Sequence, residues 1–120
     1  MGSIVRLSDL RRKAKPTFFT RPELNLLLSL YSRQVARGLW RDYAIGLQDG
    51  KALFAVFRHA DESALYTIVK SAPTGDRKGE YTLLSGRLPL ARAATFSEIL
   101  GALRARLQPN AVALDSEGGR

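Results

Sequence analysis

The chain has 120 residues, 45% of them hydrophobic, and a formal net charge of +8 at pH 7, which fits one globular domain with its own core. It contains no cysteine, so a disulfide framework, a thiolate metal site and a cysteine nucleophile are excluded. No apolar run approaches the roughly 18 residues that span a bilayer. We therefore expect a cytoplasmic protein with no membrane partner.

The N-terminal segment is strongly basic. Residues 1–21 carry six basic side chains and one acidic side chain. We predict that residues 1–17 form a flexible basic arm, with consecutive cations at Arg11, Arg12 and Lys13. Such an arm can contact a nucleic acid or an acidic protein, and it can equally be a solvated tail that aids solubility.

A helix is predicted from about residue 21 to residue 37. Thr20 and Glu23 form a capping box, in which each side chain accepts a hydrogen bond from the backbone N–H of the other residue. Gly38 is typical of the position just after a helix. The apolar positions recur with helical spacing, which predicts one buried face made of Leu24, Leu27, Leu28, Tyr31 and Val35.

Residues 39–58 are the clearest fold signal and predict a β-hairpin. Asp49-Gly50 is well suited to a two-residue type I′ turn, because both central residues need positive φ. A two-residue loop there also fixes the strand register. It places three pairs opposite each other, namely Tyr43 with Val56, Ile45 with Phe54 and Leu47 with Ala52.

The second face of this hairpin is unusually apolar. It carries Leu53 and Phe57 among the small residues Ala44, Gly46 and Ala55. A hairpin with one solvated face should be polar there. We therefore expect this face to be covered, either by a helix of the same chain or by a second copy that contacts Leu53 and Phe57.

Two more strands are predicted after the hairpin, at residues 65–70 and 81–84, where apolar and β-branched residues alternate. Pro89 then argues against another long regular element. The prediction is thus a four-stranded antiparallel meander.

A second capping box, Thr95 with Glu98, opens a second helix that ends before Pro109. Gly101 inside it costs about 1 kcal/mol relative to alanine, which predicts close packing against the sheet. The fold class is α+β, with two helices flanking the meander in sequence and a two-layer sandwich as the natural packing. We predict one domain at residues 18–108 and a disordered tail at residues 109–120.

Three stretches resemble a known family. They are residues 40–45 (Trp-Arg-Asp-Tyr-Ala-Ile), residues 55–58 (Ala-Val-Phe-Arg) and Gly79-Glu80-Tyr81. Over roughly residues 18–107 the chain resembles domain-of-unknown-function family 2794, a group of short alphaproteobacterial proteins. The resemblance implies a bacterial cytosolic protein and carries over no catalytic residues.

The strongest candidate site lies on the hairpin and consists of Trp40, Arg41, Tyr43 and Arg58. In one interpretation, Arg41 and Arg58 bind an anion or a nucleic-acid backbone while Trp40 and Tyr43 stack on bases. In the other, Trp40 closes the edge of the core and Arg41 pairs with a nearby carboxylate.

Other chemistry has weaker signals. Arg77 and Lys78 are candidate phosphate contacts, but their glycine-flanked loop lacks the spacing of a phosphate-binding motif. His59 is the only histidine, and no orienting partner is evident for it. The carboxylates are scattered, so we expect neither a metal nor another cofactor.

Two functional hypotheses follow. The first is a small non-enzymatic binding or adaptor protein that forms a homodimer through Leu53 and Phe57. The alternative is a nucleic-acid-binding regulatory protein that uses the basic arm and the face formed by Trp40, Arg41 and Arg58. An enzyme is the least favoured class, because no catalytic constellation is visible.

Overall fold

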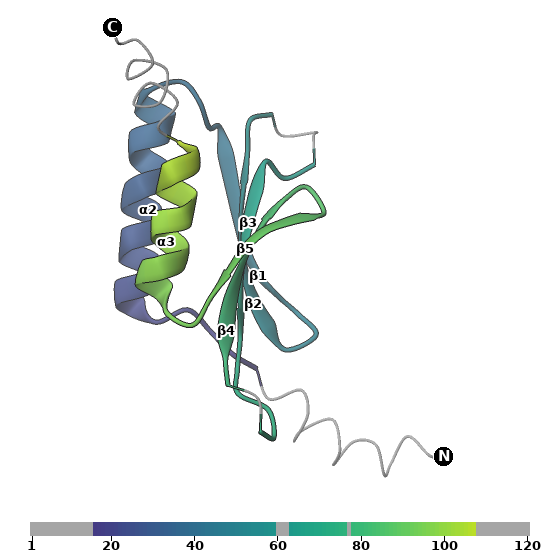
Figure 1. Cartoon of the computed structure of the whole chain (residues 1–120). Coiled ribbons are helices and arrows are strands. Elements are labelled where there is room, and N and C mark those ends of the chain that lie inside the picture. The colour runs from purple at the N-terminus through teal and green to yellow at the C-terminus, as the bar shows by residue number, and fades with distance from the viewer. Residues whose placement is uncertain (1–15, 60–62, 77, 108–120) are drawn as a thin grey trace, which may run out of the picture.

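The structure is a computed structural model that describes residues 16–59, 63–76 and 78–107. The predicted tail and most of the predicted arm, including Arg11, Arg12 and Lys13, lie outside these residues. The elements in chain order are α2 (Arg21–Ala36), β1 (Asp42–Gln48), β2 (Lys51–Phe57), β3 (Tyr66–Ser71), β4 (Glu80–Ser85), β5 (Leu88–Ala93) and α3 (Phe96–Arg106). They form a two-layer α+β structure with both helices on one side of the sheet (Figure 1).

The sheet is an antiparallel meander with the strand order β1-β2-β3-β4-β5. The predicted four strands were one too few, because Pro89 lies within β5. A proline lacks a backbone N–H, but an edge strand needs its N–H groups on one side only. The pairing of β4 with β5 also shifts register between Leu83 and Leu84.

The hairpin prediction is confirmed in both turn and register. Asp49 and Gly50 have φ angles of 54° and 77°, as a type I′ turn requires. Ile45 lies opposite Phe54, and all other pairs between β1 and β2 follow the same register.

Helix α2 begins as predicted, and its buried face differs from the prediction mainly at Val35. Thr20 and Glu23 form the capping box through bonds of 2.8 and 3.2 Å. Val35, expected to be buried, is 41% exposed. The predicted Leu27 is fully buried, and the predicted Leu24, Leu28 and Tyr31 are partly buried against the core. The other buried positions of α2 are Glu23, Leu30 and Gln34. Glu23 binds side chains of the sheet, and this contact helps to set which face of α2 points inward.

Helix α3 also begins with its predicted capping box, formed by Thr95 and Glu98. Its buried residues Ile99, Leu100 and Leu103 face the core. The prediction for Gly101 was wrong: this residue is exposed, and a methyl group placed on it would meet no atom within 4 Å. Packing therefore does not require glycine there.

The core lies between the two helices and one face of the sheet. Its largest fully buried side chains are Trp40, Phe54, Leu27, Ile68 and Leu83. Because α2 and α3 both cover this face, neither covers the other face, which carries Leu53 and Phe57. No helix among the described residues is long and apolar enough to span a membrane.

Candidate binding surfaces

The first candidate surface is the sheet face opposite the helices, here called the open face. Strand alternation and the register give it an apolar centre, made of Leu53, Ala55, Phe57, Val69 and Leu84. These side chains are half-buried, and Lys51, Glu80 and Arg92 lie toward the periphery. A shallow hollow of about 390 Å³ includes Leu53, Val69 and Leu84 in its lining.

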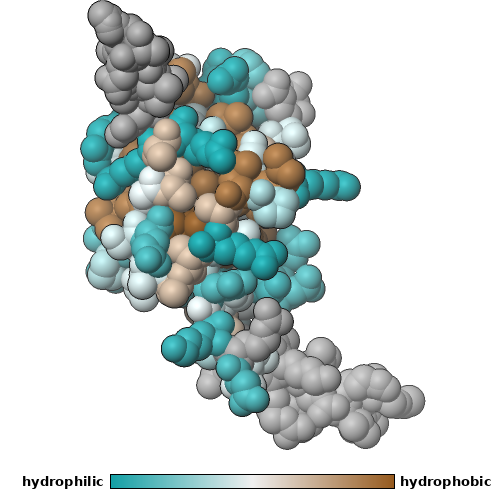
Figure 2. Space-filling view, in the orientation of Figure 1, coloured by the Kyte–Doolittle hydropathy of each residue, from teal (hydrophilic) through white to brown (hydrophobic). Residues whose placement is uncertain are grey.

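Figure 2 views the sheet along its edge. Brown apolar side chains gather over the middle of the visible side, and teal hydrophilic ones flank them. The open face itself combines an apolar centre of half-buried side chains with charged residues at its periphery, a pattern typical of an interaction surface.

The second candidate surface runs along β1 at the edge of the sheet. All seven residues of β1 are exposed, although Ile45 and Leu47 point toward the helix layer. An apolar groove of about 210 Å³ lies between this strand and the start of α2. Phe18, Leu24, Ile45 and Leu47 contribute to its lining, and Phe18 is 62% exposed.

Trp40 belongs to the core and is 2% exposed. Its ring centroid lies 6.2 Å from that of Tyr31 on α2. The indole is therefore not accessible for stacking on a base, and the interpretation that Trp40 closes the core is the one that holds. Tyr43 is 39% exposed, but its ring packs edge-on against Tyr31 at 4.7 Å and stacks on Phe54.

Arg41 and Arg58 are both exposed. They lie just beyond Asp42 and Phe57, the pair of β1 and β2 residues farthest from the hairpin turn. The backbone N–H of Arg41 donates to the carbonyl of Phe57 at 2.8 Å. Asp42 Oδ1 accepts the backbone N–H of Tyr43 at 2.8 Å, and among the described residues Asp42 forms no ion pair with Arg41. Within the described part of the chain, neither arginine forms an ion pair.

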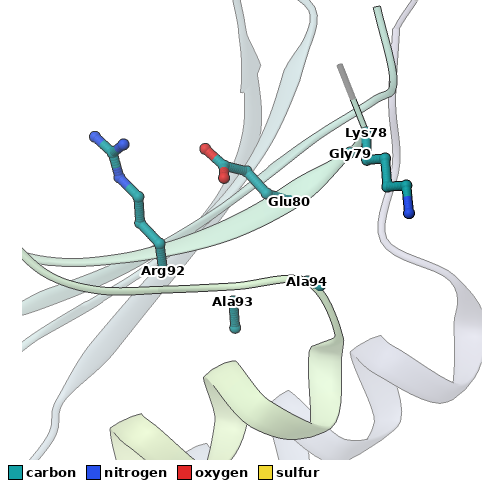
Figure 3. A pocket seen from close by; sticks show the side chains of 6 residues that line it. All are labelled: Lys78, Gly79, Glu80, Arg92, Ala93 and Ala94. Atoms are coloured by element: carbon teal, nitrogen blue, oxygen red, sulfur yellow. The ribbon is translucent and has the colours of Figure 1, made fainter. Parts of the chain in front are cut away.

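Lys78 lies at the other end of the sheet, in the loop between β3 and β4. It is therefore separated from Arg41 and Arg58, and Arg77 is outside the described residues. Figure 3 shows the open hollow of about 420 Å³ beside Lys78, where Glu80 and Arg92 project side by side and Lys78 points away. These charges do not converge on one point, so the hollow lacks the geometry of an anion site.

A buried polar cluster escaped the sequence analysis. The carboxylate of Glu23 on α2 accepts a hydrogen bond from Lys70 Nζ of β3 at 2.8 Å and another from the Tyr81 hydroxyl of β4. Lys70 also donates to the carbonyl of Phe18 at 3.0 Å. The cluster thus joins the start of α2 to two strands.

The charges of this cluster are set by its surroundings. Burial alone would raise the pKa of Glu23, but hydrogen bonds from Lys70, Tyr81 and the Thr20 backbone, together with the Lys70 charge, lower it overall. Burial and the adjacent carboxylate of Glu23 raise the pKa of the Tyr81 hydroxyl. At neutral pH the cluster is therefore a carboxylate held by an ammonium and a neutral phenol.

One signal could have revealed the cluster. Glu23 has helical spacing with the buried Leu27 and Leu30, while Lys70 and Tyr81 alternate onto the inner face of their strands. The cluster has no second carboxylate, and Lys70 and Tyr81 both donate to Glu23, so its contacts are those of a structural tie. Among the described residues, no three His, Cys, Asp or Glu side chains gather to bind a metal.

The sequence also matches a known protein family. A family model described as Protein of unknown function (DUF2794) matches residues 17–97. The chain belongs to the DUF2794 family. The matched region includes α2 and all five strands, so the open face and the β1 edge both lie within the DUF2794 domain. No curated protein and no solved structure matches the chain.

Proposed function

We propose that this DUF2794 protein is a non-enzymatic, cytoplasmic binding or adaptor protein that self-associates through its open face. The observation that carries the proposal is the placement of α2 and α3 on the same side of the sheet. This arrangement leaves Leu53 and Phe57 at the surface with Val69 and Leu84 beside them.

The open face suits a flat partner. Ala44, Gly46 and Ala55 lie among the larger side chains, and small residues let a second backbone approach closely. Removal of this apolar surface from water contributes roughly 25 cal/mol per Å². A second copy presents the same flat surface and is the partner that we propose.

The double variant Leu53→Glu with Phe57→Glu tests this function. It should reduce the molar mass measured by light scattering at fixed concentration, because buried carboxylates would oppose the contact. Leu26→Glu with Leu88→Glu is the matched control, since these leucines are 44% and 63% exposed and lie elsewhere. An unchanged mass for a well-folded Leu53→Glu, Phe57→Glu variant would refute the open-face contact.

A nucleic-acid-binding regulator remains the second candidate. It is favoured by one observation, the exposed pair Arg41 and Arg58 beside each other at one end of the hairpin. Because Trp40 is buried, such binding would rest on phosphate contacts, with weak sequence preference and steep salt dependence.

Fluorescence anisotropy with single- and double-stranded RNA and DNA, titrated with salt, tests this candidate on the full chain. Arg11→Ala, Arg12→Ala and Lys13→Ala together, or Arg41→Ala with Arg58→Ala, should each weaken binding and reduce the salt slope. Arg87→Ala with Arg92→Ala is the matched control for the second set. Absence of binding at low salt would end this candidate.

A further inference from the structure

Strand β1 is an edge strand without the usual protection. Its outer side has no neighbouring strand among the described residues. It contains no proline, and Asp42 at its first position is its one charged residue. An exposed edge strand with so little charge is a template for pairing with another strand.

The opposite edge is protected by contrast. Strand β5 contains Pro89, carries Arg92 and has the register shift at Leu83/Leu84. Proline, charge and irregular pairing are devices that stop edge-to-edge association. The two edges of one sheet therefore differ, and only β1 is suited to accept a strand.

The helix layer leaves room beside β1. Tyr43, Ile45 and Leu47 point toward the helices yet are 39%, 47% and 49% exposed. The groove of about 210 Å³ adjoins Ile45 and Leu47, with Phe18 at its rim. An added strand would bury these side chains and close the groove.

We propose that β1 pairs antiparallel with β1 of a second copy, around a two-fold axis at Ile45. Ile45 then faces Ile45 of the second copy, and Tyr43 faces Leu47. On the helix side of the joined sheet the side chains that meet are aliphatic or aromatic, and both α2 helices come to lie on that same side.

Charge complementarity selects this register and this partner. With Ile45 on the axis, Arg41 lies alongside Asp49 of the second copy, and the two-fold repeats the pair. Asp42 falls opposite Gln48, a residue that can donate a hydrogen bond to it. The strand thus complements itself in charge and in hydrogen bonding.

The backbone groups also agree with the pairing. The two residues that flank a two-residue turn form backbone hydrogen bonds with each other. The backbone N–H and C=O groups of the even-numbered residues of β1 therefore bond to β2, and those of the odd-numbered residues point away from β2, to the open edge. The register pairs odd positions with odd positions, as antiparallel bonding requires. In the single chain, Asp42 Oδ1 binds the outward N–H of Tyr43 at 2.8 Å, and pairing exchanges that bond for one to a Leu47 carbonyl.

This contact is separate from the open face, which lies on the other side of the sheet from Ile45. Both contacts use a second copy, so the test must tell them apart. Because the chain contains no cysteine, a single introduced thiol reports on one surface alone.

The experiment is crosslinking of full-length Ile45→Cys with a short bismaleimide, at low micromolar concentration. Leu88→Cys on the β5 edge is the control, since Leu88 is 63% exposed. We expect covalent dimers from Ile45→Cys far in excess of those from Leu88→Cys. The yield should persist when Leu53→Glu and Phe57→Glu are added, which isolates the edge contact from the open face.

A charge reversal tests the register. Arg41→Glu should weaken association by roughly tenfold, because it sets two like-charge pairs across the contact. Addition of Asp49→Lys should restore most of the affinity. Equal crosslinking at positions 45 and 88, or an Arg41→Glu protein that associates like the unaltered chain, would overturn the proposal.

Discussion

At the scale of single residues, Glu23 stands out because its side chain accepts three hydrogen bonds. Its carboxylate accepts the Thr20 backbone N–H and the Lys70 ammonium, both at 2.8 Å, and also the Tyr81 hydroxyl. One residue therefore caps α2 and ties it to β3 and β4. Loss of a buried acceptor leaves its donors unpaired, which costs more than the hydrogen bond itself contributes.

Glu23→Ala should lower the free energy of unfolding by about 2–4 kcal/mol. It removes the Glu23 half of the capping box and leaves the partly buried Lys70 ammonium without its carboxylate. Glu23→Gln keeps the shape and one acceptor oxygen, so it should cost less. Urea denaturation followed by circular dichroism measures both. A change below the error of the fit for Glu23→Ala would contradict the role of the cluster.

The same residue predicts a pH dependence. The folded-state pKa of Glu23 lies below its ordinary value of 4.5, so the folded protein favours the ionised form. Its contribution to stability is fully present above that ordinary value and is lost as the pH falls through the lower, folded-state pKa. The urea concentration at the unfolding midpoint should therefore decrease as the pH is lowered below about 4.5. In Glu23→Gln this decrease with pH should be smaller.

At the scale of elements, the helix ends followed local sequence closely. Both capping boxes and the Gly38 stop formed as expected, with Gly38 at a φ of 79°. The glycine inside α3 is different, because it meets no neighbour and needs no unusual backbone angle. Glycine at this position gives the unfolded chain more conformational freedom to lose on folding, which lowers the stability of the helix.

Gly101→Ala should raise the free energy of unfolding by about 0.5–1 kcal/mol, since alanine favours the helix and meets no atom within 4 Å. Gly38→Ala is the control and should destabilise, because its φ of 79° disfavours a side chain. Thermal unfolding of both variants gives the comparison. A destabilised Gly101→Ala protein would show a contact that the structure does not contain.

At the scale of the whole molecule, the placement of two helices on one side decides what the sheet exposes. Phe54 and Phe57 both lie on β2, yet Phe54 is 2% exposed under the helices and Phe57 lies on the open face. Phe54 and Phe57 lie three positions apart and so point to opposite faces of the strand, one to the core and the other to a candidate interface.

Phe54→Ala should cost about 3–5 kcal/mol of unfolding free energy, because it leaves a cavity in the core. Phe57→Ala should cost much less in the dilute, unassociated protein. Chemical denaturation at low protein concentration makes the comparison. Equal losses would mean that the open face is packed as tightly as the core.

The sequence by itself determined the local features. The hairpin turn, its register and both capping boxes rest on residues close together in the chain, such as Asp49 with Gly50 and Thr20 with Glu23. These short-range rules also gave the α+β class. They did not predict β5, which contains Pro89. Proline is tolerated in an edge strand, and whether a strand lies at an edge depends on its neighbours in the sheet.

Only the tertiary structure decided which surfaces are free. The sequence placed Leu53 and Phe57 on one face of the hairpin, but it did not determine whether a helix covers them. Nor did it bring Glu23 together with Lys70 and Tyr81, because these residues are far apart in the chain. The physical reason is that burial depends on the packing of distant elements, whereas turns and caps depend on bonds between near neighbours.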